Sequence, residues 1–227
     1  MVKPILWKEW QEQRWKLAFG SVMLGSLTWA FFASHVVSNQ EVIVGVWIVG
    51  GTLLALHTAM GVFAPERSAG TTTFLLSKPI LPSRAFACKW IMGWLSLAVP
   101  LSVCGIGMAM ATRVGPQAGS ISLGFLAIGT LRAMATSTVI YSLTCCLSPR
   151  KSEEGGTGLV GLSLVAAMFL HFSIGPHGSV IQQVAKAINP LYFAFPAHVS
   201  LMLLIPGQAC LLALSLWIGL RKWERSA

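Results

Sequence analysis

Residues 42–64 read VIVGVWIVGGTLLALHTAMGVFA, and this run contains no Lys, Arg, Asp or Glu. About 20 apolar residues in a helix cross the hydrocarbon core of a bilayer, so the run predicts a transmembrane helix. Apolar runs of similar length occur near 17–37, 89–111, 121–147, 157–175 and 199–220. The sequence therefore predicts an all-α polytopic membrane protein with six transmembrane helices.

The composition agrees with a protein whose main solvent is lipid. Of the 227 residues, 55% are hydrophobic and 10% are charged, and the mean hydropathy is +0.71. Soluble domains have about 25% charged residues. The net charge of +9 would suggest a nucleic-acid partner in a soluble protein, but here we expect no nucleic acid and attribute the excess charge to membrane topology.

The distribution of basic residues predicts the orientation of the six spans. Thirteen of the sixteen Lys and Arg residues fall on the side that holds both termini. Cytoplasmic loops are enriched in Lys and Arg, so we expect both termini to be cytoplasmic in the inner (plasma) membrane.

The stretch 64–90, APERSAGTTTFLLSKPILPSRAFACKW, joins the second and third spans on that side. It is too polar to lie in lipid and too short to be a domain. Residues 66–77 predict a short helix that Pro79 ends. A partner that pushes on this helix would move the second and third spans together.

The N-terminal stretch 4–16, PILWKEWQEQRWK, predicts a helix lying along the inner membrane surface. Its tryptophans suit the headgroup boundary, where an amphipathic ring is stable. We therefore expect an interfacial helix over 1–16 and a six-helix domain over 17–227. The alternative is an ordinary first turn of the first span.

The stretch 176–198, PHGSVIQQVAKAINPLYFAFPAH, lies between the fifth and sixth spans. It contains an apolar helix face that Asn189–Pro190 ends, followed by the apolar residues 191–195. This pattern predicts short re-entrant helices that dip into the outer leaflet. The alternative is an apolar loop packed on the ends of the spans.

These features together resemble the membrane subunits of ABC transporters of the type-2 exporter class. The N-terminal match is WKEWQEQRW at 7–15. The match in the loop consists of Glu66-Arg67, Gly70-Thr71, Leu75-Leu76, Pro79, Ser83-Arg84 and Lys89. The family also has a six-helix permease and short re-entrant helices between its fifth and sixth spans.

The resemblance implies that the 64–90 stretch holds a cytoplasmic coupling helix that docks on a separate ABC ATP-binding subunit. The residues it assigns to this contact are Glu66, Arg67, Gly70, Thr71, Phe74 and Leu75. The residues it assigns to the interfacial helix are Trp7, Glu9, Trp10 and Arg14. It also implies a dimer with a second copy or a paralogue. ATP and Mg would belong to the ATP-binding subunit, so we expect no cofactor in this chain.

The sequence itself agrees with ATP hydrolysis by a separate subunit. It contains no G-x-x-x-x-G-K-[ST] motif, the loop that cradles nucleotide phosphates in many ATPases. We therefore expect that the chain is not an enzyme.

Arg132 lies inside the fourth apolar run. A charge at the centre of a span costs about 2.5–3.5 kcal/mol on insertion scales, so this side chain should face protein, water or substrate. It is a candidate residue of the substrate pathway, and a purely structural role is the alternative.

The sequence predicts no metal site. His35, His171, His177 and His198 fall near the expected outer face, but no two of them have ligand spacing. The five cysteines are scattered in apolar surroundings and are expected to be free thiols.

Two other function classes predict sequence features different from those of the exporter. An ATP-independent carrier or channel predicts acids or polar relay residues within the spans, and the spans have almost none. A membrane-embedded enzyme needs a cluster of acids, histidines or nucleophiles near the bilayer. The apolar spans and short outer loops favour a hydrophobic or amphiphilic cargo.

Overall fold

The computed structural model describes residues 3–33, 40–63, 81–114, 121–147, 154–174, 185–194 and 201–225. Within these ranges all regular structure is helical. The helices are α1 (Lys3–Ala33), α2 (Gln40–Met60), α5 (Pro82–Val114), α6 (Leu123–Leu147), α7 (Glu154–Ile174), α9 (Pro190–Ala194) and α10 (Leu201–Glu224), with one further helical turn at 185–188.

Six of these helices are long and apolar enough to cross a membrane: α1, α2, α5, α6, α7 and α10. This confirms the predicted number of spans and indicates a multi-pass helical membrane protein. Several boundaries differ; the second helix, for example, ends at Met60 rather than near residue 64. The third helix begins at Pro82 rather than near residue 89, and the sixth extends to Glu224. Proline suits the first turn of a helix because its missing N–H would have no partner there.

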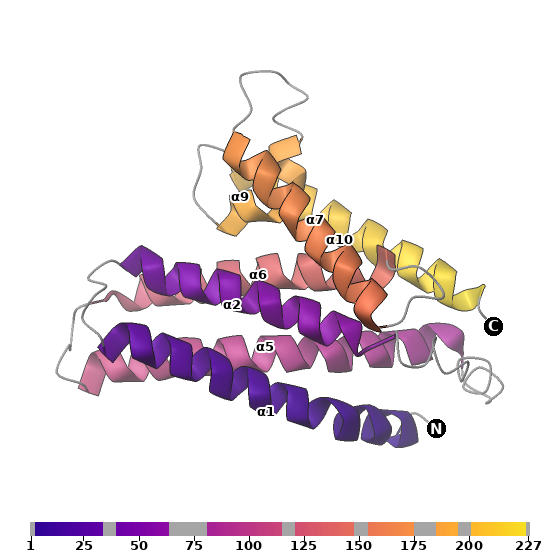
Figure 1. The fold of residues 1–227 in the computed structure, drawn as a ribbon, viewed down its shortest axis with the longest axis horizontal. Coiled ribbons are helices and arrows are strands. Elements are labelled where there is room, and N and C mark those ends of the chain that lie inside the picture. The colour runs from indigo at the N-terminus through magenta and orange to yellow at the C-terminus, as the bar shows by residue number, and fades with distance from the viewer. Residues whose placement is uncertain are drawn as a thin grey trace.

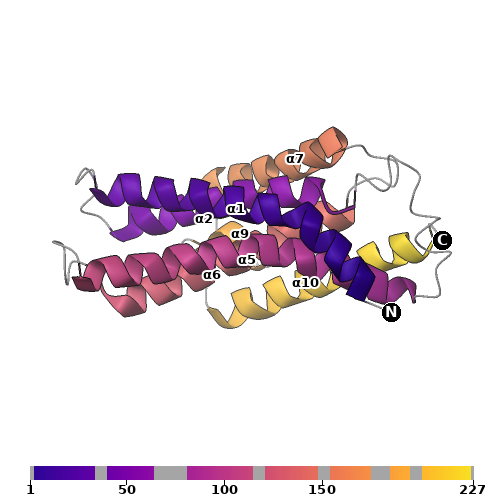
Figure 2. The ribbon, with the colours of Figure 1, turned by 90° about the horizontal axis from the view of Figure 1, so that it is seen from below.

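Residues 4–16 are helical, as predicted, but they continue into the first span as one helix, α1. The continuity has a simple cause, because no proline or glycine interrupts residues 5–19. Figure 2 shows the N-terminal part of α1 turning away from the direction of the rest of the helix. That this part lies along a membrane surface stays a prediction.

The helices form three layers (Figures 1 and 2). α1 packs on α5 in one outer layer, and α2 packs on α6 in the central layer. The third layer contains α7, α9 and α10, which contact the central layer. Both chain termini lie at the same end of the bundle (Figure 1), which we call the terminal end, and the opposite end is the far end.

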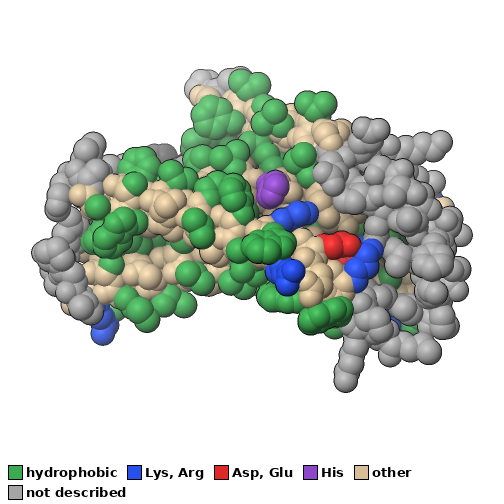
Figure 3. All heavy atoms as spheres, turned by 60° about the horizontal axis from the view of Figure 1, so that its bottom comes forward, with side chains coloured by type: hydrophobic (Ala, Val, Ile, Leu, Met, Phe, Trp, Pro, Cys, Tyr) green, Lys and Arg blue, Asp and Glu red, His purple; other side chains and the backbone are tan. Residues whose placement is uncertain are grey.

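The outer surface of the bundle is strongly apolar. Large side chains such as Val22, Trp29, Phe169 and Leu170 are 60–71% exposed. On the face shown in Figure 3, hydrophobic side chains are spread along the length, and most of the charged side chains lie toward the terminal end, with one basic side chain at the far end. A soluble monomer rarely exposes so much apolar surface, whereas lipid covers it in a membrane protein.

Polar side chains inside the bundle form hydrogen bonds between helices. Trp47 Nε1 in α2 donates to Thr28 Oγ1 in α1 at 3.0 Å. The hydroxyls of Ser142 in α6 and Ser215 in α10 are 2.8 Å apart. Such bonds hold transmembrane helices together because the hydrocarbon around them offers no alternative partner.

Candidate functional site

A buried ion pair joins the N-terminal part of α1 to the first turns of α5. The Nζ atom of Lys89 lies 2.5 Å from Glu9 Oε1, and the two side chains are 2% and 1% exposed. An ion pair this deeply buried is weak evidence for stability, but removing one partner of such a pair is strongly destabilising. The pair therefore fixes α1 to α5 at the terminal end.

An aromatic cluster at the same end consists of Phe63, Phe86 and Trp223. The rings of Phe63 and Phe86 are stacked, with centroids 5.2 Å apart and planes 14° from parallel. The Trp223 ring of α10 lies 5.6 Å from that of Phe63. Phe63 is the last described residue before the stretch 64–80, and Phe86 lies in the first turns after it. The cluster therefore holds together the two ends of that stretch.

The six residues that the resemblance assigns to the coupling helix lie outside the described residues. They are Glu66, Arg67, Gly70, Thr71, Phe74 and Leu75. Their role stays a prediction. The structure does place the segments on both sides of them, and it connects one of these segments to α1 through Lys89.

The four residues assigned to the interfacial helix separate into two groups. Trp7 and Trp10 are 64% and 43% exposed, so their rings face outward. Arg14 is also exposed, and its guanidinium lies 5.5 Å from the centroid of the Trp15 ring. Glu9 alone points into the protein. The N-terminal part of α1 thus presents an aromatic and basic outer side and a carboxylate on its inner side.

Arg132 in α6 is half-buried. It lies one helical turn from Thr136, whose hydroxyl donates to the carbonyl of Pro190 at 3.3 Å. Residues four apart share one face of a helix, so Arg132 is on the side of α6 that faces α9. Within the described ranges, no hydrogen bond or ion pair involves its guanidinium.

Residues 185–194 lie against the middle of α6 rather than at its end, because Thr136 is near the centre of Leu123–Leu147. The helical turn ends at residue 188, as the Asn189–Pro190 pair predicted. Asn189 Nδ2 donates to the Met168 carbonyl in α7 at 2.8 Å, and its Oδ1 accepts from the Leu191 N–H at 3.0 Å. We call residues 185–194 the inserted segment.

The inserted segment also contacts two aromatic side chains of α7. The Tyr192 ring lies 4.9 Å from Phe172 and 5.9 Å from His171. His171 also lies 3.3 Å from Asn189 Nδ2. The other three histidines near the expected outer face, His35, His177 and His198, are outside the described ranges.

Replacing Gly207 with alanine is expected to displace the inserted segment from α10. A Cβ at Gly207 would lie 2.5 Å from the carbonyl oxygen and 2.9 Å from the carbonyl carbon of Ala187, and backbone atoms do not move aside easily. We expect amide exchange over 185–192 to rise about tenfold, measured by hydrogen–deuterium exchange.

The matched control is Gly25→Ala in α1, where no atom lies within 4 Å of the added carbon. Exchange over 185–192 should not change in this variant. Equal exchange in both variants would show that the close approach at Gly207 does not hold the segment.

Sequence reasoning missed the pairing of Lys89 and the contacts of Asn189 and Gln208. In the sequence Lys89 stands out only as one of the loop residues that match the family pattern. A signal was present, because a lone polar or charged side chain in an apolar run needs a partner. Two residues are isolated in this way within apolar runs: Lys89 in AFACKWIM and Gln208 in IPGQACLL. The partners themselves come from distant segments that no local pattern identifies.

No known protein-family model matches this chain, and no curated protein matches it significantly.

Proposed function

We propose that this chain is the transmembrane permease subunit of an ATP-driven ABC exporter. It works as a dimer with a second copy or a paralogue, and a separate ATP-binding subunit on the cytoplasmic side hydrolyses ATP with Mg. The proposal places both termini in the cytoplasm. The cargo is hydrophobic or amphiphilic.

The main support for the proposal comes from the contacts between the residues that flank the stretch 64–80. Phe63 and Phe86 stack on each other across the stretch, and three residues after Phe86 the side chain of Lys89 is paired with Glu9. A force applied to this stretch therefore reaches α2, α5 and α1 together. A loop that only connects two helices does not need an aromatic contact between its ends and an ion pair to a third helix.

This arrangement supports a specific mechanism of coupling. Nucleotide-driven closure of the ATP-binding subunit displaces the coupling helix, and the aromatic cluster passes the displacement to α2, α5 and α10. The ion pair carries it to α1. A rigid-body shift of packed helices of this kind opens or closes a pathway without local unfolding.

The first test is to purify the tagged chain from its native membrane in mild detergent and identify the proteins that accompany it. We expect an ATP-binding subunit in stoichiometric amount. Replacing Gly70 with tryptophan should reduce its recovery about tenfold or more, because a bulky side chain at a docked helix disrupts interface packing.

The control is Gly107→Trp in α5, a position that is exposed, has no atom within 4 Å of an added Cβ, and lies toward the far end. This variant should retain the ATP-binding subunit. A wild-type chain that purifies alone and moves solute without ATP would contradict the proposal and favour a carrier or channel.

A further inference from the structure

Two basic side chains lie beside the short helix α9. Thr136 of α6 contacts Pro190, the first residue of α9, and Arg132 lies one turn from Thr136 on the same side of α6. The Nζ atom of Lys186 lies 5.9 Å from the centroid of the Tyr192 ring, which belongs to α9. Because α9 is only five residues long, or about 7.5 Å, both cations border one small region of the bundle.

Contacts with two neighbouring helices hold the backbone of this region in place. Gln208 Nε2 in α10 donates to the carbonyls of Ala187 at 2.9 Å and Ile188 at 3.1 Å. The next residue, Asn189, donates to a carbonyl of α7. Lys186 is followed directly by these three anchored residues, so the backbone that carries its ammonium is fixed beside α7 and α10.

The helices around this region have no acidic residue near it. α6 and residues 185–194 contain no Asp or Glu, and the acids of α7 and α10, Glu154 and Glu224, lie at the terminal end. Glu41 lies in the first turn of α2 at the far end. Among the described residues, no ion pair includes either of the two cations.

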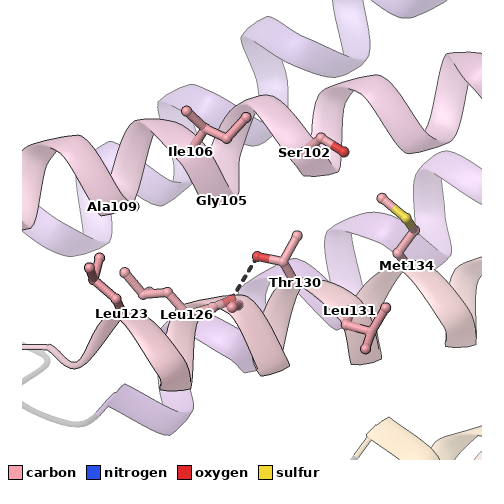
Figure 4. Close-up of a pocket in the computed structure, with 10 residues that line it drawn as sticks. Ser102, Gly105, Ile106, Ala109, Leu123, Leu126, Thr130, Leu131 and Met134 are labelled. Atoms are coloured by element: carbon pink, nitrogen blue, oxygen red, sulfur yellow. Dashed lines mark hydrogen bonds between the residues drawn. The ribbon is translucent and has the colours of Figure 1, made fainter.

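The neighbouring surface of α6 supplies no counter-charge either. Leu131, the residue before Arg132, and Met134 line a hollow of about 450 Å³ between α5 and α6 (Figure 4). The described residues that line this hollow include no charged side chain. The hydroxyl of Thr130, which also lines it, donates to the Leu126 carbonyl at 2.8 Å. Arg132 therefore has apolar surroundings on this side.

A positive charge in this part of the chain requires an explanation. Three basic residues fall outside the side that holds both termini: Arg113, Arg132 and Lys186. Arg113 lies in the last turn of α5, where the carbonyls at the end of a helix favour a cation. Arg132 lies near the middle of α6, and a charge within a span is costly unless a partner compensates it. A bound anion would supply that compensation.

Both cations are half-buried, so each is partly accessible, and the exposed surface beside them is apolar. Ile128 and Leu131, on either side of Arg132 in the sequence of α6 up to that residue, are 53% and 63% exposed, and Ile188 near Lys186 is 44% exposed. A small hydrated anion would lose its water to reach these charges and would leave the apolar surface uncovered. An anionic group carried on an apolar chain matches both parts of the surface.

The number of positive charges indicates the kind of anionic group. A carboxylate or a phosphate diester carries a single negative charge and would leave one of the two cations without compensation. A phosphate monoester, such as phosphoserine, carries a charge of about −1.5 to −2 at pH 7. The guanidinium of an arginine also matches phosphate oxygens with two parallel hydrogen bonds.

We propose that Arg132 and Lys186 bind the phosphate monoester of an anionic amphiphile, whose apolar chain covers the exposed side chains beside them. The guanidinium of Arg132 donates to two phosphate oxygens, and the ammonium of Lys186 contacts the same group. That this amphiphile is the cargo rests on the proposed exporter function, whereas the binding itself does not.

The test uses the full chain reconstituted in phosphatidylcholine vesicles. The probe is a palmitoyl lysophosphatidic acid with a diazirine on the acyl carbons nearest the glycerol and an alkyne tag at the end of the chain. After irradiation, mass spectrometry locates the cross-links, and we expect them on residues 128–136 and 185–194. Arg132→Gln should reduce this labelling about tenfold, and Lys186→Gln about three- to tenfold, because each removes one of two charge-assisted contacts at a partly exposed site.

The matched control is Arg113→Gln, which also removes a positive charge from an exposed residue outside the side of the termini, but at the end of α5. It should label like the wild type. Arg132→Lys keeps the charge and loses the paired hydrogen bonds, so its labelling should lie between those of the wild type and Arg132→Gln. Unfolding in SDS verifies that each variant is folded, and Lys186→Gln carries the test if Arg132→Gln does not fold.

Labelling that neither Arg132→Gln nor Lys186→Gln reduces would overturn the site. Equal labelling by a monopalmitoylglycerol probe with the same diazirine would overturn the selection for an anion. Equal competition by palmitate or phosphatidylglycerol, each with a single negative charge, would overturn the selection for a phosphate monoester. Equal competition by glycerol 3-phosphate would assign the site to a free phosphate ester and overturn the amphiphile.

None of these measurements depends on ATP, so the site and the exporter function can fail separately. A chain that purifies without an ATP-binding subunit but shows this labelling would overturn the exporter function and leave the site in place. A chain that retains the ATP-binding subunit but labels evenly over its exposed helices would overturn the site alone.

Discussion

Replacing Lys89 with methionine is expected to lower the free energy of unfolding by about 3–5 kcal/mol. The substitution removes the ammonium that pairs with the Glu9 carboxylate, in a site that is 1% exposed, and a buried charge that loses its ion-pair partner is costly. Glu9→Leu should have an effect of similar size, because it removes the carboxylate that pairs with the buried ammonium of Lys89. Both variants should loosen the contact between the N-terminal part of α1 and α5.

The double variant Glu9→Leu with Lys89→Met removes both charges and keeps similar volumes. Buried ion pairs replaced by apolar residues are often neutral or more stable, so this variant should recover most of the loss. Unfolding by SDS in mixed micelles, followed by circular dichroism, measures all four members of the double-mutant cycle. Additive losses in the double variant would show that the two charges do not interact.

Replacing Gly93 with leucine is expected to lower the free energy of unfolding by about 2–4 kcal/mol. Gly93 lies where α2, α5 and α6 meet, and a Cβ there would overlap the Tyr141 hydroxyl and lie 2.5 Å from Val62 Cγ2. The larger side chain must expel Tyr141, which is fully buried and donates to the Trp90 carbonyl at 3.0 Å. Small residues at such crossings let transmembrane helices approach closely.

Gly107→Leu in the same helix is the control for this prediction. No atom lies within 4 Å of a Cβ at Gly107, so the added side chain extends into open space. Its stability should stay within about 0.5 kcal/mol of the wild type or rise, since leucine has the higher helix propensity. The same SDS titration serves both variants, and equal stabilities would contradict the crowding at Gly93.

The sequence predicted the helices well because hydrophobicity and length alone define a span. The charge-free run at 42–64 and the break at Asn189–Pro190 are local signals, and both appear in the structure. The start of α1 was predicted less well. Tryptophans at 7–15 indicate an interface, but only a proline or glycine would have separated this segment from the span, and residues 5–19 contain neither.

The contacts between helices could not be predicted in the same way. Within a span almost every face is apolar, so periodicity does not indicate which helix a face meets. Nothing in the sequence around Glu9 indicates that its ion-pair partner, Lys89, lies 80 residues away. The depth of the inserted segment likewise depends on Thr136 and Gln208, two polar residues in separate helices that meet it only in the folded protein.

The ion pair also constrains how the protein is made. Glu9 leaves the ribosome 80 residues before Lys89, which at about 5–20 residues per second corresponds to a delay of about 4–16 s. During this interval the carboxylate lacks the ammonium of Lys89, so the contact that this ion pair makes between α1 and α5 cannot form. The ion pair between the first and third helices is therefore a late contact, which forms only after the third helix has been synthesised.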